Sequence, residues 1–283
     1  MSDRPLTEGE QWARDELAQL LARRFTLPAV ARFLWSSSVR SAQIRRSRPE
    51  LARRAWSWAG LGAGAWVALA VAGRQPFRRR LKTGLGWWAL TSAMVDWHLG
   101  MVETKDGRPR NLSTADFLTL ARAWLVPVAL DAPTPLVCVL ASVTDTLDGP
   151  LARRAGPTRA GRDLEGLVDA CFGAAALRGA RRRGWLGRRV VAAELTRLAT
   201  GLTYALVVYF GRSRPPAEGV VHAARTTSAL RVGGLLLAGV GRRREADVLM
   251  LTGSAASVGL VARAAYSEWP SRVPRPIREP GTR

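Results

Sequence analysis

The chain has 283 residues, with 43 lysines and arginines against 22 aspartates and glutamates, which gives a formal net charge of +21. The arginines bracket apolar runs, without zinc-finger spacing, a basic zipper or an RNP-like segment, so the charge indicates membrane lipids as partners and argues against nucleic acid. Hydrophobic residues make up 47% although the mean hydropathy is only -0.03, because arginine clusters interrupt the apolar runs. The low average therefore does not exclude a membrane protein.

Residues 1–55 differ from the rest of the chain in their pattern. Large apolar side chains recur there at roughly helical spacing, with charged residues between them: Trp12, Leu17, Leu20, Leu21 and Phe25. This pattern predicts an amphipathic N-terminal region that lies on a membrane surface. The first apolar run of useful length begins near residue 56, so we expect no cleavable signal peptide.

Residues 56–110 predict two membrane helices. The segment 56–73 is uncharged over 18 residues, about the shortest length that spans a hydrocarbon core, and 85–102 is a second candidate. Asp96 and His98 interrupt that second segment and are interpreted as a buried polar pair. The tryptophans are interpreted as anchors at the membrane surface, including Trp87, Trp88 and Trp97.

Six further apolar segments follow, which brings the predicted membrane spans to eight. They are 117–130, 134–144, 164–177, 190–210, 232–240 and 248–266. The predicted fold class is all-α, a polytopic membrane helical bundle. Residues 267–283 are rich in proline and are predicted to be a disordered tail.

The stretch 145–169 carries the clearest chemistry. Asp145 and Asp148 are three residues apart and Glu165 and Asp169 are four apart, so on helices each pair shares one face. Two antiparallel helices joined by a turn around Gly156 would bring the four carboxylates together. Oxygen ligands of this number suit Mg²⁺ or Mn²⁺ and could hold two ions.

The neighbouring residues in the stretch suit a diphosphate. Small residues leave room for a ligand or for close helix contact: Gly149, Ala152 and Gly161. Arginines, whose planar guanidinium matches phosphate oxygens, crowd the connecting loop: Arg153, Arg154, Arg159 and Arg162. Carboxylates, a metal, small residues and arginines together indicate a diphosphate site.

In this stretch the sequence resembles the CDP-alcohol phosphatidyltransferase family. The family signature is Asp, two residues, Asp-Gly, two residues, Ala-Arg, about eight residues, Gly, three residues, Asp, three residues, Asp. The chain supplies Asp145, Asp148, Gly149, Ala152, Arg153, Gly161, Glu165 and Asp169 at these places. It departs from the signature at Glu165, which replaces the third Asp, and in the seven residues that separate Arg153 from Gly161.

The resemblance extends over residues 111–266. Upstream, 116–127 looks like the family's first core helix, with matches at Thr119, Leu120, Arg122 and Pro127 and with Asp116 in place of Asn. Downstream, 224–229 is faintly similar to a Lys-Thr-Thr segment. The resemblance implies a six-helix core, so residues 56–110 would add about two helices in front of it.

The resemblance implies transfer of a phosphatidyl group from a CDP-diacylglycerol-like lipid donor to an alcohol acceptor, with release of CMP, in phospholipid biosynthesis. It implies two Mg²⁺ or Mn²⁺ ions, a homodimer, and an active site on the cytoplasmic side of a membrane. The Arg, Ala and Gly bias of the composition suggests a bacterial plasma membrane.

The resemblance also assigns roles to residues. The metal ligands are Asp145, Asp148, Glu165 and Asp169, and Asp169 is also the expected general base. The expected substrate-binding residues are Gly149, Ala152, Arg153, Gly161 and Arg122.

Two other interpretations stay open at this point. Glu165 and the shortened loop suggest a degenerate family member that binds CDP-lipid or metal without turnover, and a membrane scaffold or transporter with an incidental carboxylate cluster is the other. The acceptor is also open: a phosphorylated one would need additional cations, for which Arg122, Arg197 and Arg225 are candidates.

Overall fold

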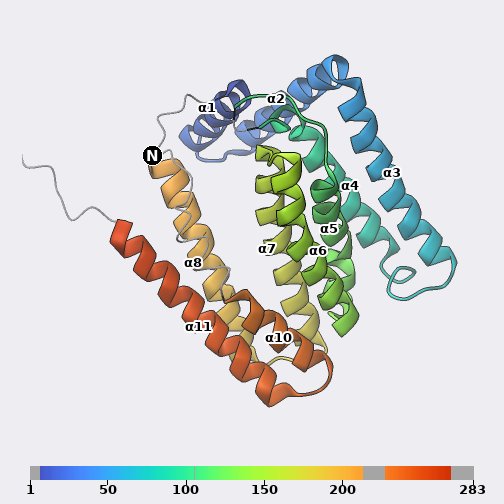
Figure 1. The fold of residues 1–283 in the computed structure, drawn as a ribbon, viewed down its shortest axis with the longest axis vertical. Helices are drawn as coiled ribbons and strands as arrows, with labels where there is room; N and C mark the ends of the chain where they lie inside the picture. The colour runs from blue at the N-terminus through green and yellow to red at the C-terminus, as the bar shows by residue number, and fades with distance from the viewer. Residues whose placement is uncertain (1–6, 105, 213–226, 269–283) are drawn as a thin grey trace, which may run out of the picture.

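The computed structural model describes residues 7–104, 106–212 and 227–268, and these form ten α-helices, one 3-10 helix and no β-strand. The predicted all-α class is therefore confirmed for the described part of the chain (Figure 1). The helices are α1 (Glu8–Ala22), α2 (Leu27–Ser47), α3 (Pro49–Val71), α4 (Leu81–Trp97), η1 (Leu99–Met101), α5 (Thr114–Asp131), α6 (Pro135–Ala155), α7 (Arg159–Arg182), α8 (Arg188–Arg212), α10 (Ser228–Gly239) and α11 (Arg243–Glu268).

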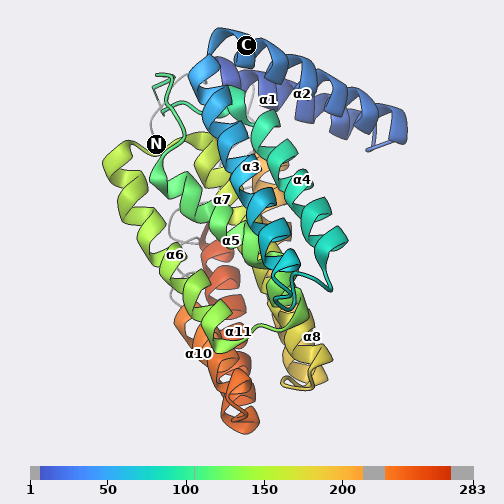
Figure 2. The ribbon, with the colours of Figure 1, turned by 90° about the vertical axis from the view of Figure 1, so that its right-hand side faces the viewer.

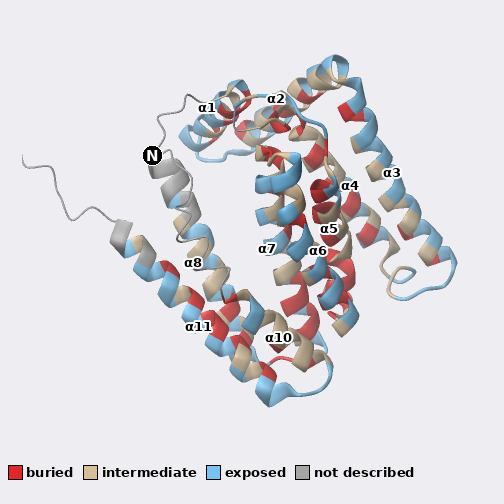
Figure 3. Cartoon of the chain, viewed as in Figure 1, coloured by how far each residue is buried: buried red, intermediate tan, exposed pale blue. Residues whose placement is uncertain are grey.

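Helix α5 is the centre of the fold. Eleven of its 18 residues are buried. It packs along both α6 and α7, while α3 and α4 lie on one side of this group and α8, α10 and α11 lie on the other (Figures 1 and 3). A polar side chain on the inner faces of α5 is therefore surrounded by protein and needs a partner there.

Helices α5 and α7 approach closely because α7 has a glycine at the contact. A Cβ added at Gly179 would overlap the carbonyl oxygen of Ala129 and would lie 2.9 Å from Cδ of Pro133. A backbone carbonyl cannot move aside as a flexible side chain can. Gly179 therefore sets the distance between the two helices that carry the central part of the fold.

We predict opposite effects for two glycine substitutions on α7. Gly179→Ala should lower the free energy of unfolding by about 1–3 kcal/mol, because the added methyl group overpacks the α5–α7 contact. Gly173→Ala should raise it by up to about 1 kcal/mol, because a Cβ added there would meet no neighbouring atom within 4 Å and alanine favours the helix. Thermal unfolding of the detergent-purified protein measures both changes, and equal shifts would contradict the close contact.

Helices α3 and α4 pack through two reciprocal pairs of tryptophan and glycine. Trp88 of α4 fills the space over Gly62 of α3, and Trp66 of α3 fills the space over Gly84 of α4. Trp88 is 5% exposed and donates a hydrogen bond from its indole nitrogen to the carbonyl of Ala59 at 2.7 Å. The interpretation of Trp88 as a membrane-surface anchor was wrong, because its ring is enclosed between two helices.

Two further tryptophans join this helix pair to α5. Trp87 donates to the carbonyl of Ala123 at 2.8 Å, and Trp124 donates to the carbonyl of Gly62 at 2.9 Å. Indole N–H groups need an acceptor when they are buried, and helix carbonyls supply it here. The two helices in front of the family-like core are thus bonded to its first helix.

Asp96 also connects two helices, but its partner is not the one that the sequence suggested. Its carboxylate accepts hydrogen bonds from Ser41 and Arg45 of α2, whereas His98 Nδ1 contacts the carbonyl oxygen of Met94 at 2.7 Å. The predicted pairing of Asp96 with His98 was therefore wrong. Asp96 instead joins α4 to α2.

Ion pairs also occur at the far end of α5 and between the C-terminal helices. Asp131 ends α5 and is buried, and the arginines that surround it are Arg79, Arg80 and Arg183. In the C-terminal helices, Glu194 of α8 pairs with Arg197 at 3.0 Å and accepts a hydrogen bond from Ser254 of α11 at 2.5 Å. These buried carboxylates each have charged or polar partners, as the cost of burying a lone charge requires.

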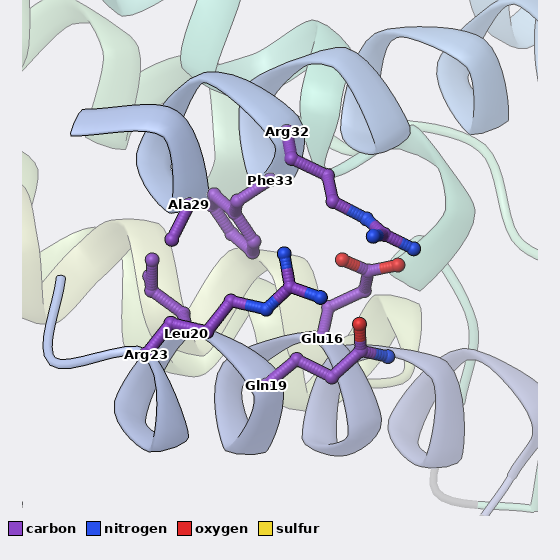
Figure 4. Close-up of a pocket in the computed structure, with 7 residues that line it drawn as sticks. All are labelled: Glu16, Gln19, Leu20, Arg23, Ala29, Arg32 and Phe33. Atoms are coloured by element: carbon purple, nitrogen blue, oxygen red, sulfur yellow. The ribbon is translucent and has the colours of Figure 1, made fainter. Parts of the chain in front are cut away.

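Helices α1 and α2 form a hairpin across one end of the bundle (Figure 2). The predicted apolar stripe is divided: Leu20 is buried and Trp12 packs on the core, whereas Leu21 and Phe25 are exposed, so the membrane-surface position stays a prediction. The largest exposures in this region are on α2, with Leu27 at 85% and Trp35 at 73%. A small pocket lies between the two helices, where Glu16 sits between Arg23 and Arg32 (Figure 4).

One helix among the described residues is long and apolar enough to cross a membrane, over Arg243–Arg263 in α11, and Ser228–Gly239 is a shorter apolar helix. Each of the eight predicted spans overlaps a helix, but the polytopic arrangement itself stays a prediction. Residues 269–283 of the predicted tail lie outside the described residues, as does Arg225.

Candidate metal and diphosphate site

The predicted turn between the two carboxylate-bearing helices is present. Helix α6 ends at Ala155 and is followed by Gly156, whose φ of +84° is a conformation that glycine adopts without strain. Helix α7 begins after Thr158, whose hydroxyl caps it by accepting a hydrogen bond from the amide of Gly161 at 3.1 Å. A three-residue connection, 156–158, therefore reverses the chain between the two helices.

Three of the four predicted carboxylates meet at one place. Carboxylate oxygens of Asp145, Asp148 and Glu165 lie within 4.8 Å of one another, which is a spacing that could hold a divalent metal ion. Asp148 is buried, Glu165 is half-buried and Asp145 is exposed, so the group opens toward one side. The spacing of the acidic residues in the sequence correctly predicted this convergence.

Arg122 of α5 lies against the same carboxylates from the inside of the fold. Its guanidinium contacts Asp145 at 3.3 Å, Asp148 at 2.9 Å and Asp169 at 2.8 Å, and its side chain is only 3% exposed. Arg122 therefore brings the fourth carboxylate, Asp169, to the group. Its positive charge offsets the mutual repulsion of the carboxylates, which are close together and partly removed from water.

Of the three contacts, the one to Asp148 has full hydrogen-bond geometry. Arg122 Nη2 donates to Asp148 Oδ2, while Nε and Nη1 are held by charge without an aligned hydrogen bond. Thr119, one turn before Arg122 on α5, also reaches Asp148 Oδ2 at 3.5 Å. Asp148 is thus held by two side chains of α5.

The spacing of the carboxylates in the sequence predicted a site between two helices and did not show that α5 lies between them. Helices α6 and α7 each pack extensively on α5 and much less on each other, so the site is formed by three helices rather than two. The spacing of Thr119 and Arg122, three residues apart on a mainly apolar helix, was the available signal, because such residues share a face and need partners.

The predicted substrate-binding residues fall into two groups. Arg153 is exposed and Ala152 half-buried on the last turns of α6, and a Cβ at Gly149 would lie 3.4 Å from Nη1 of Arg153. Gly161 differs, since a Cβ there would lie 2.8 Å from Oδ1 of Asp116. The space beside Gly161 is thus filled by α5, whereas Gly149, Ala152 and Arg153 lie near the open side.

The fold and this cluster define an all-helical protein with a carboxylate site suited to a divalent metal ion. A family model of CDP-alcohol phosphatidyltransferase matches residues 112–262, which is more than half of the 283-residue chain. The chain therefore belongs to the CDP-alcohol phosphatidyltransferase family. Comparison with curated proteins and with solved structures found no match.

The family membership confirms the resemblance carried by residues 145–169. The family transfers a phosphatidyl group from a CDP-alcohol, normally uses divalent metal ions, and is integral to membranes. The matched region contains α5, α6 and α7 and hence the whole carboxylate site, while α1 to α4 precede it.

We predict that Arg122 and a divalent metal ion compensate the same negative charge. Arg122→Met should lower the free energy of unfolding of the metal-free protein by about 1–3 kcal/mol, because buried and half-buried carboxylates lose their counter-charge. Mn²⁺ should then raise the melting temperature of the variant more than that of the parent, because the ion stabilises the folded state by binding to it. Thermal unfolding with and without Mn²⁺ measures both effects.

A control for this prediction is Arg178→Gln, which removes an exposed arginine from α7. This variant should respond to Mn²⁺ as the parent does. An Arg122→Met variant that shows the parent's response to Mn²⁺ would contradict the shared role.

Proposed function

We propose that the protein transfers a phosphatidyl group from CDP-diacylglycerol, or a similar CDP-linked lipid, to an alcohol acceptor and releases CMP. The observation that carries this proposal is the meeting of the four signature carboxylates and Arg122 between α5, α6 and α7. A scaffold has no need for this combination of carboxylates, small residues and arginine in the order of the family signature.

The donor set fits Mg²⁺ or Mn²⁺, because both ions take carboxylate oxygens as ligands. Asp145, Asp148 and Glu165 would hold one ion, and Asp169 would complete the ligands of a second. Bound ions would supply charge neutralisation at the diphosphate of the donor lipid.

Arg122 has a second role in this proposal. Once divalent ions supply the positive charge, the guanidinium is no longer required as the counter-charge of three carboxylates. It is then available to donate to a phosphate oxygen of the donor, for which its planar group is well suited. Gly149 and Ala152 add little bulk on the open side, where the cytidine would approach the backbone of α6.

We assign to Asp169 the role of general base on the acceptor hydroxyl. Its side chain is 43% exposed, unlike that of Asp148 at 5%, so an alcohol can reach it. As general base it would accept the proton of the acceptor hydroxyl while that oxygen attacks phosphorus, and CMP would leave on the opposite side.

Three finer proposals accompany this function. Arg197 pairs with Glu194 at 3.0 Å, so a phosphorylated acceptor would compete with that ion pair.

The enzyme would act in phospholipid biosynthesis in a bacterial plasma membrane, with the site on the cytoplasmic side. A homodimer is the proposed assembly, which cross-linking in native membranes can test.

We predict that Asp169→Asn abolishes metal-dependent CMP release, because an amide cannot accept the acceptor proton. Membranes that contain the protein would be incubated with labelled CDP-diacylglycerol and a panel of alcohols, and the lipid product identified. Glu245→Gln, which removes an exposed carboxylate on α11, should retain activity. Undiminished turnover in Asp169→Asn would contradict the base assignment, and absence of CMP release from the parent with every alcohol would contradict the reaction.

A second prediction concerns the departure from the family signature. Glu165→Asp should weaken turnover and Mn²⁺ binding by about tenfold or more, since the shorter side chain withdraws its oxygens by about 1.5 Å from a group now within 4.8 Å. CMP release and Mn²⁺ titration measure the two effects. A gain of activity in Glu165→Asp would instead indicate a degenerate site.

A further inference from the structure

Helix α1 precedes the residues that match the family, yet it contacts the first residue of α7 within the signature stretch. Nη1 of Arg159 lies 3.1 Å from Oε1 of Glu10, and their side chains are 19% and 8% exposed. Arg159 is the first residue of α7, directly after the capping Thr158. This ion pair therefore connects the beginning of the chain to the beginning of a helix that carries two signature carboxylates.

Glu10 is held firmly in place by its own helix. Its Oε2 accepts a hydrogen bond from the amide of Thr7 at 3.0 Å, which completes the capping box of α1. The hydroxyl of Thr7 in turn donates to the carboxylate of Glu103. A Cβ at Gly9 would lie 2.9 Å from the carbonyl oxygen of Gly100, so the start of α1 is packed closely on the η1 segment.

Glu103, two residues after η1, also contacts Arg159 directly. The amide of Arg159 donates to the carbonyl oxygen of Glu103 at 3.4 Å. Beneath these polar contacts, Ala13 of α1 belongs to the same apolar cluster as Ala160 and Leu164 of α7. The start of α7 is therefore fixed by charge, by a backbone hydrogen bond and by apolar packing, all from residues before the family-like core.

The carboxylate of Glu10 offsets an unfavourable positive charge at the start of α7. An arginine at the first position of a helix faces the positive end of the helix dipole, which is an unfavourable place for a cation. The carboxylate of Glu10 neutralises that arginine and places a negative charge near the same helix end. Asp163, on the next turn of α7, is a second partner at 3.5 Å from Nε of Arg159, but its side chain is 47% exposed. Without Glu10, Arg159 would lose the more buried of these two carboxylates.

The position of α7 decides where two of the carboxylates lie. Glu165 and Asp169 follow Arg159 by about two and three helical turns on the same helix. Asp145 and Asp148 lie on α6, so a shift of α7 along or about its axis changes the distances between the two carboxylate pairs. The metal site tolerates little change, since its oxygens lie within 4.8 Å of one another.

We propose that α1 is a positioning element of the site: the ion pair between Glu10 and Arg159 fixes the start of α7 and thereby sets Glu165 and Asp169 for metal binding. This inference rests on the proposed function, because it assumes that the carboxylates hold the metal of the reaction. Glu10 and Arg159 are positioning residues that act through α7 and do not touch the reacting atoms.

The test measures Mn²⁺ affinity of the full-length purified protein by calorimetric titration without any lipid substrate. Glu10→Gln and Arg159→Gln should each weaken Mn²⁺ binding about three- to tenfold, at or below the range for residues that orient metal ligands. The double variant should lose no more than either single one, since both changes remove the same interaction. The matched control is Glu8→Gln on the same helix, whose 92% exposed side chain pairs with Arg40 at 3.5 Å; it should bind Mn²⁺ as the parent does.

A charge exchange adds a rescue. Glu10→Arg combined with Arg159→Glu should bind Mn²⁺ more tightly than Glu10→Arg alone, because the exchanged pair restores the attraction. Unchanged Mn²⁺ affinity in Glu10→Gln, equal loss in Glu8→Gln, or fully additive losses in the double variant would overturn the proposal. A lower melting temperature with unchanged affinity would also overturn it, since that outcome reports a merely structural contact.

The outcome also separates this proposal from the reaction. A parent that binds Mn²⁺ but releases no CMP would contradict the proposed function. The Mn²⁺ affinities of the variants would still decide whether Glu10 and Arg159 position α7. For a parent that binds no Mn²⁺, hydrogen exchange over residues 156–165 decides: faster exchange in Glu10→Gln but not in Glu8→Gln supports the fixed start of α7. Equal exchange in the two variants overturns it.

Discussion

The contact between Arg122 and three signature aspartates is the interaction on which the rest of the structure depends. Asp145 and Asp148 come from α6 and Asp169 comes from α7, and these two helices meet mainly through α5. Carboxylates this close together repel, and their desolvation adds to the cost, so the helices need a cation between them. Arg122 supplies it from the buried helix α5, and all four residues lie within the region that matches the family.

Close packing makes this arrangement possible. Gly179 lets α7 lie against the backbone of α5, while tryptophans of α4 and α5 donate to the carbonyls of neighbouring helices. These contacts bind α3 and α4 to the first helix of the family-like core. Helix α1 then reaches the first residue of α7 through the ion pair between Glu10 and Arg159, by which we propose that residues before the core support the site.

Several sequence interpretations failed for one common reason, which is that a residue's partner lies far away in the chain. Trp88 has the amphipathic character of a membrane-surface anchor, but Gly62 provides a space that the ring fills. Asp96 was paired with His98, its neighbour in the sequence, while its actual partners come from α2. The helices also extend beyond the apolar runs, because charged residues such as Arg181 and Arg182 continue α7.

The sequence by itself determined the family, the helical class and the convergence of the carboxylates. It could do so because helical spacing and a three-residue turn are local properties, and the signature keeps them within residues 145–169. Only the tertiary structure decided that α5 lies between α6 and α7, that Arg122 is the counter-charge of the carboxylates, and that Glu10 holds the start of α7. These contacts depend on how distant helices pack, and such packing is set by the whole core rather than by any local pattern.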